Sequence, residues 1–241
     1  MKLKTKALAA AMAFAFAGAA NAAIDLPQTD VANSGGSELV LTIWDSVNLV
    51  SETYDLFDGG NTLGWNDFDS VDPNTAYSFQ ANSSIDLNAA GVVWSVIAAD
   101  DIFNGDGANG SPNPTYGKRI MSTTSDLGTM SLTEANVETS ASAAQAYMNS
   151  ANSQATHSTE ADGQHSATGG DSYWGFKMPA NWEVAGASGN VGEAMDFFMA
   201  ANIYDVTGSF FKTATYTGTG IVAAAGQWTL DNTGLLKYSA V

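Results

Sequence analysis

The stretch GVVWSVIAADDIFNGDGANG, residues 91–110, sets the plan of the chain. It opens with VVWSVI at residues 92–97, a run of β-branched and aromatic residues that predicts a β-strand. The nearly continuous apolar character of this run indicates a strand that is buried on both faces. The stretch ends in a segment rich in aspartate, asparagine and glycine. We therefore expect a surface loop with acidic and amide groups directly after the buried strand.

The same plan recurs along the chain, as apolar strands joined by loops rich in Asp, Asn, Gly, Ser and Thr. Further strands are predicted at residues 39–44, 47–54, 76–80, 84–87, 118–124, 193–206 and 209–217. Residues 227–230 and 235–239 flank Asp231-Asn232-Thr233-Gly234, which predicts a β-hairpin with a four-residue turn. A polar loop is expected at 155–171, followed by an apolar segment at 173–178 that Pro179 ends.

Residues 131–154 differ from the rest of the chain. Ser131-Leu132-Thr133-Glu134 matches a capping box, which marks the start of a helix. Apolar residues then recur at helical spacing, at Val137, Ala141, Ala144 and Met148. Because strands outnumber helices, we expect a mainly β fold: a β-sandwich-like domain, jelly-roll or immunoglobulin-like, with one inserted helix around 131–154.

The first 22 residues have the pattern of a secretory signal peptide. Three lysines precede an apolar run at residues 7–17, and Ala20-Asn21-Ala22 is an A-x-A site that predicts cleavage after Ala22. We therefore expect a secreted or cell-surface protein, with the periplasm as the alternative location. Residues 23–36 are expected to form an extended arm, and residues 37–241 a single β-rich domain. No transmembrane segment is predicted in the mature chain.

The net negative charge of the chain excludes some classes of binding partner. The 241 residues carry a formal net charge of −17, and removing residues 1–22 takes three basic residues and no acidic ones, leaving −20. Such a chain repels phosphate backbones and anionic membranes, so no nucleic-acid partner is expected. The chain contains no cysteine, so stability has to come from a core, from bound ions or from assembly.

The acidic loops are candidate metal sites, with Ca²⁺ as the ion that best suits their ligands. The first candidate set is Asp100, Asp101, Asn104, Asp106 and Asn109, which offers carboxylate and amide oxygens on one loop. Asp67, Asp69 and Asp72, with Asn66 and Asn74, offer a second set. Neither set has the spacing of an EF-hand. The simpler interpretation is a pair of solvated turns that use Asp and Asn for local hydrogen bonds.

Other candidate binding residues lie in segments expected to be loops. His157 and His165 bracket Glu160 and Asp162 and could bind a transition metal, although a solvated polar loop is the favoured interpretation. Trp65 and Trp182 are the candidates for a surface on which glycans stack, although core or partial burial is the favoured interpretation for both. The remaining tryptophans in predicted strands, Trp44, Trp94 and Trp228, are expected in the core.

Catalytic motifs are missing from the sequence. It has no cysteine, no G-x-S-x-G elbow and no H-E-x-x-H helix, so we expect a protein that is not an enzyme. The composition favours an exported bacterial surface or extracellular-matrix structural protein, a subunit of a self-assembling fibre or layer that joins through edge strands and the N-terminal arm. The alternatives are a secreted Ca²⁺-dependent carbohydrate-binding module and a hydrolase that uses paired carboxylates.

Overall fold

The computed structural model describes residues 24, 26, 37–58, 61–63, 76–100, 119–154, 164–201, 203–204, 210–211, 216–217 and 222–240. These residues form a mostly β fold with two helices, α2 (Glu134–Asn152) and α3 (Trp174–Asn181). None of the described helices is long and apolar enough to cross a membrane.

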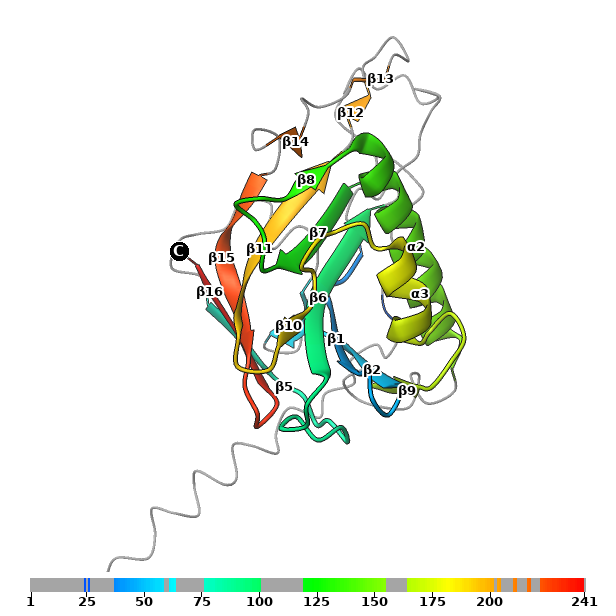
Figure 1. Ribbon diagram of the computed structural model, residues 1–241, viewed down its shortest axis with the longest axis vertical. Helices are drawn as coiled ribbons and strands as arrows, with labels where there is room; N and C mark the ends of the chain where they lie inside the picture. The colour runs from blue at the N-terminus through cyan, green and yellow to red at the C-terminus, as the bar shows by residue number, and fades with distance from the viewer. Residues whose placement is uncertain are drawn as a thin grey trace, which may run out of the picture.

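One antiparallel sheet of ten strands dominates the structure (Figure 1). Its strands follow one another in the order β5 (Ala76–Gln80), β16 (Leu235–Ala240), β15 (Val222–Leu230), β11 (Ala194–Ala201), β7 (Arg119–Thr124), β6 (Val92–Asp100), β1 (Val40–Asp45), β2 (Val50–Asp55) and β9 (His165–Ala167), and β10 (Gly189–Asn190) pairs with β6. Three short ribbons lie outside this sheet: β3 (Phe57–Asp58) with β4 (Asn61–Thr62), β8 (Ser131–Leu132) with β14 (Tyr216–Thr217), and β12 (Ile203–Tyr204) with β13 (Phe210–Phe211).

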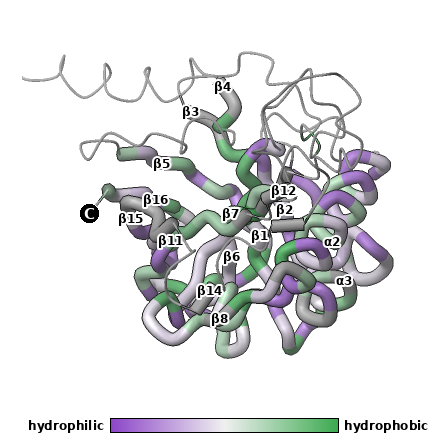
Figure 2. Tube along the Cα trace, turned by 90° about the horizontal axis from the view of Figure 1, so that it is seen from above, coloured by the Kyte–Doolittle hydropathy of each residue, from purple (hydrophilic) through white to green (hydrophobic). Residues whose placement is uncertain are grey.

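The sheet curls into a half-barrel, and the two helices lie together on its outer face (Figures 1 and 2). The curl brings the two ends of the sheet towards each other, so that Tyr54 of β2 packs edge-to-face on Phe79 of β5 with ring centroids 5.9 Å apart. The mainly β class is therefore confirmed. The sandwich is not confirmed, because a single curled sheet supplies the opposing walls of its own core.

Strand alternation divides the apolar residues between two cores. We call the core inside the curl the inner core; among its members are Leu41, Tyr54, Phe79, Trp94, Phe197, Trp228 and Tyr238. We call the core between the sheet and the helices the helix-side core; among its members are Val40, Ile97, Phe198, Tyr147, Trp174 and Trp182. The central strands thus bury both faces, as the run at 92–97 predicts.

The predicted helix is confirmed, and its predicted cap is displaced by two residues. Thr133 is the N-cap: its Oγ1 accepts from the Asn136 backbone N–H at 3.2 Å, while Asn136 Oδ1 accepts from the Thr133 N–H at 2.8 Å. Ser131 and Leu132 instead pair with β14. The apolar residues predicted to share a helix face are all fully buried, at Val137, Ala141, Ala144 and Met148.

Several local predictions are wrong. Residues 84–87 are expected as a strand, but they form a bend and the start of a turn. Asp86 accepts from the Asn88 backbone N–H, and Ser84 donates to the buried Glu52. Pro179 is expected to end a segment, but α3 continues through it to Asn181. Residues 165–167 are expected in a loop, and they form β9 on the edge of the sheet.

The start of the expected N-terminal arm is docked on its own molecule. Ile24 is only 2% exposed and belongs to the helix-side core. Its backbone N–H donates to Asn152 Oδ1 at 2.8 Å, and its carbonyl accepts from Asn152 Nδ2 at 2.9 Å. One amide at the last residue of α2 therefore holds both backbone groups of Ile24. Residues 27–36 lie outside the described part of the chain.

Asn152→Ala should lower the free energy of unfolding by about 1–3 kcal/mol, because it removes both hydrogen bonds to the buried Ile24 backbone. Chemical denaturation measures the change. Asn149→Ala is the matched control, because Asn149 lies on the same helix with an exposed side chain. Equal stability of the two variants would contradict the docking of Ile24.

Candidate functional site

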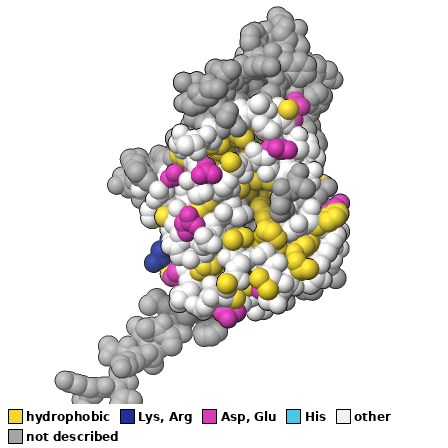
Figure 3. Space-filling view, in the orientation of Figure 1, with side chains coloured by type: hydrophobic (Ala, Val, Ile, Leu, Met, Phe, Trp, Pro, Cys, Tyr) yellow, Lys and Arg dark blue, Asp and Glu magenta, His cyan; other side chains and the backbone are white. Residues whose placement is uncertain are grey.

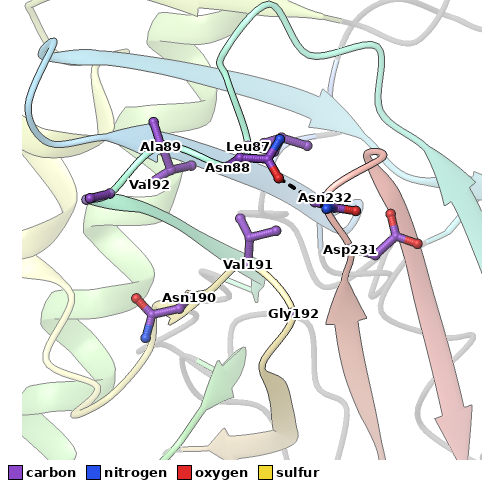
Figure 4. A pocket seen from close by; sticks show the side chains of 11 residues that line it. Leu87, Asn88, Ala89, Val92, Asn190, Val191, Gly192, Asp231 and Asn232 are labelled. Atoms are coloured by element: carbon purple, nitrogen blue, oxygen red, sulfur yellow. Dashed lines mark hydrogen bonds between the residues drawn. The ribbon is translucent and has the colours of Figure 1, made fainter.

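Three connections meet at one end of the half-barrel and border a pocket of 410 Å³ (Figure 4). They are the loop 81–91 between β5 and β6, the turn 191–193 between β10 and β11, and the turn 231–234 between β15 and β16. The volume falls within the range of roughly 300–1,000 Å³ that is typical of small-molecule sites. We call this pocket the end groove. Its lining residues are Leu87, Asn88, Ala89, Ala90, Gly91, Val92, Asn190, Val191, Gly192, Asp231 and Asn232.

The end groove has an apolar floor and a polar rim. Leu87 and Val92 are buried members of the inner core, and Val191 packs against the same core. The side chains of Asn88, Asn190 and Asn232 are exposed at the rim. The floor exists because the inner core reaches the open end of the curl, where turns rather than further strands cover it.

A hydrogen bond between two loops crosses the rim. Asn232 Nδ2 donates to Asn88 Oδ1 at 3.1 Å, and Figure 4 shows the two side chains pointing toward each other. Asp86 Oδ1 in turn accepts from the Asn88 backbone N–H at 3.0 Å. Asn88 and Asn232 also border a second hollow of 320 Å³, whose lining includes Gln80 and Thr233. The Asn88–Asn232 pair therefore lies between two neighbouring hollows.

Asp231 places a negative charge at the rim. Its Oδ1 accepts from the Thr233 hydroxyl at 2.6 Å, from the Thr233 backbone N–H at 2.8 Å and from the Leu235 N–H at 3.1 Å. The hydrogen bond from the Thr233 side chain is the main cause that holds the pKa of Asp231 below its ordinary value. The backbone hydrogen bonds and the nearby Lys237 ammonium act in the same direction. The carboxyl is therefore ionised at neutral pH.

In Figure 3 acidic side chains are spread over the visible face and basic ones are few.

A buried carboxylate fixes the loop 81–91. Glu52 of β2 is fully buried, and its two oxygens accept from Ser83 Oγ at 2.5 Å, from the Ser84 backbone N–H at 3.0 Å, from Ser84 Oγ and from Tyr54 OH at 2.8 Å. Tyr54 lies on β2 itself, whereas Ser83 and Ser84 follow β5 at the far end of the sheet. Glu52 therefore ties the loop that borders the groove to a strand on the opposite side of the half-barrel.

The strand that leads into this loop forms one edge of the sheet. Among the described residues β5 pairs with β16 and with no other strand, although β3 lies close to it. The sequence of β5, AYSFQ, carries no charge. Phe79 is anchored in the inner core, whereas Ala76, Ser78 and Gln80 are exposed.

Most of the predicted metal-binding residues lie outside the described part of the chain. Asp100 is the last residue of β6, opposite Arg119 of β7, whereas Asp101, Asn104, Asp106 and Asn109 are outside it. The second acidic set, at 66–74, and His157, Glu160 and Asp162 are outside it as well. His165 is buried in β9. The residues that the structure describes contain no group of three or more His, Asp or Glu placed to hold a metal.

Trp182 is buried, which agrees with the favoured interpretation and rules out its candidacy as a surface on which glycans stack. Its side chain is 6% exposed, it belongs to the helix-side core, and its Nε1–H donates to Ser122 Oγ at 3.1 Å. Trp65 lies outside the described residues. The expected burial of Trp94 and Trp228 is confirmed, whereas Trp44 is only partly buried and donates to Tyr173 OH at 3.0 Å.

Sequence reasoning did not identify the end groove. The segments at 231–234 and around Asp86 and Asn88 each contain residues typical of turns, but neither sequence predicts that the two segments lie in contact. The missing information is the strand order, which places β5, β16 and β15 side by side and brings their connections to one end.

No known protein family, curated protein or solved structure matches this chain. Its function therefore has to be inferred from its own residues.

Glu52→Ala should lower the free energy of unfolding by about 2–3 kcal/mol, because the buried Tyr54 hydroxyl and the donors of Ser83 and Ser84 lose their acceptor. Amide exchange in residues 81–91 should become faster, since the loop loses its tie to β2. Denaturation and hydrogen exchange measure the two effects. Glu183→Ala is the control, because Glu183 is exposed and accepts a single long hydrogen bond, at 3.4 Å, from Asn136. Unchanged exchange in the loop would contradict this role of Glu52.

Proposed function

We propose that this chain is an exported, non-catalytic structural protein whose copies join through the edge strand β5. The observation that carries the proposal is the position of β5 at the end of a ten-stranded antiparallel sheet, where it has a described strand partner on one side only. An edge strand presents N–H and C=O groups that can pair with a strand of another chain. The signal-peptide pattern of residues 1–22 supports export.

The sequence of β5 lacks the features that prevent such pairing. Natural sheets protect their edges with charged residues, especially lysine, with proline or with bulges. Ala76–Gln80 contains no charged residue and no proline, and its register with β16 is continuous over five residue pairs. Lys237 lies opposite Ser78, one strand in from the edge. A strand of a second molecule can therefore add beside β5 without burying a charge carried by β5 itself.

The strands at the two ends of the sheet differ in length and in burial, and this difference affects which surfaces two copies can join through. β5 is five residues long, whereas β9 at the other end has three residues, of which His165 and Ala167 are buried. Pairing of β5 in one copy with a different surface of the next copy is a heterologous contact, and such contacts build open chains unless the rotation closes a ring. This favours a fibre or a layer over a closed dimer.

The double variant Ala76→Glu/Ser78→Glu should abolish assembly of the mature protein, because charge on an edge strand opposes the addition of another strand. The monomer should stay folded, since both side chains are exposed. The control Thr229→Glu/Ser239→Glu adds the same charge to β15 and β16, which are not edge strands. Light scattering and electron microscopy measure assembly.

Two results would contradict the proposal. One is a wild-type mature protein that stays monomeric at high concentration with and without Ca²⁺. The other is an equal degree of assembly in the edge variant and its control.

A further inference from the structure

We propose that the end groove binds a neutral saccharide. The inference is independent of assembly through β5, because it rests on the pocket and not on the strand edge. It is carried by three features of the described residues: an apolar floor beneath a rim of amides, rim oxygens with unused hydrogen-bonding capacity, and a lining without basic or aromatic side chains.

The floor and the rim match the two kinds of surface on a sugar ring. A pyranose presents C–H groups on its faces and hydroxyl groups around its edge. Leu87, Val92 and Val191 offer a small apolar surface, and Figure 4 shows Val191 projecting into the space bordered by the loop that carries Leu87 and Ala89. The asparagine amides at the rim can both donate to and accept from hydroxyl groups.

The rim groups are held in place by bonds that leave other atoms available. Asn190 is fixed by Glu193 Oε2, which accepts from its backbone N–H at 2.9 Å and from its Nδ2 at 3.2 Å. Within the described residues, Asn190 Oδ1, Asn232 Oδ1 and Asp231 Oδ2 have no hydrogen-bond partner. One oxygen at the end of β10 and two on the turn 231–234 can therefore accept from ligand hydroxyls with little loss of side-chain freedom.

Charge and composition exclude other ligand classes. None of the lining residues is Lys, Arg or His, and the ionised Asp231 repels phosphates and carboxylates. No aromatic ring lines the groove to stack on a nucleobase. The apolar part of the lining is a small floor, which is too limited for a lipid tail.

The second hollow extends the site. The Asn88–Asn232 pair separates the end groove of 410 Å³ from the neighbouring hollow of 320 Å³, so a disaccharide can place one ring in each and contact the pair between them. One or two added hydrogen bonds should make disaccharides bind about fivefold more tightly than monosaccharides.

The test is calorimetric titration of the mature chain with glucose, galactose, N-acetylglucosamine and their β-linked disaccharides. We expect saturable binding of at least one disaccharide, tighter than its monosaccharide. Ala90→Trp should abolish it, because Ala90 lines the groove with an exposed side chain that a large ring would replace. Ala135→Trp is the matched control at an exposed position of α2, and thermal unfolding checks that both variants are folded.

Three results would overturn the proposal. The first is no saturable binding of any of these sugars at tens of millimolar. The second is binding that Ala90→Trp leaves unchanged. The third is binding of Ca²⁺ alone that Asp231→Asn abolishes, with no sugar binding, which would make the groove a cation site.

Discussion

Burial of the central strands on both faces is the constraint from which the architecture follows. The inner face of β1 and β6 is enclosed by the curl of the sheet, and the outer face is covered by α2 and α3. The outer face carries hydroxyl groups, and α2 supplies their partner: Tyr147 OH hydrogen-bonds Thr53 Oγ1 and, at 3.2 Å, Thr42 Oγ1. Burial raises the pKa of Tyr147 to about 12, so it remains a neutral hydroxyl that serves both threonines.

Features that depend on neighbouring residues could be predicted from the sequence. β5 and β6, the hairpin at 231–234 and the buried face of α2 lie where alternation, turn residues and helical spacing place them. The choice between a sandwich and one curled sheet could not be predicted, because it depends on distant contacts such as that between Tyr54 and Phe79. Local patterns define strands and the faces that they bury, but not the element that covers each face.

The candidate site could not be predicted from the sequence either, because it also depends on contacts between residues far apart in the chain. Asn88 and Asn232 meet although 144 positions separate them. Trp182 lies in a segment that resembles a surface loop, yet it is buried because the chain there folds back over the sheet: the Ala187 carbonyl accepts from Ser95 Oγ at 2.9 Å and from Thr123 Oγ1 at 2.7 Å. Irregular backbone can be buried where strand hydroxyls satisfy its carbonyls.

If the chain is exported as proposed, docking of Ile24 on the end of α2 would set an order of events. If the leader is removed after Ala22, a single residue precedes Ile24 in the mature chain. A peptidase that binds its substrate as an extended strand engages the main chain on both sides of the cleaved bond. Ile24 cannot occupy the peptidase and hydrogen-bond Asn152 at the same time. Cleavage after Ala22 would therefore have to precede completion of the helix-side core, and a precursor that folded too early would shield its own cleavage site.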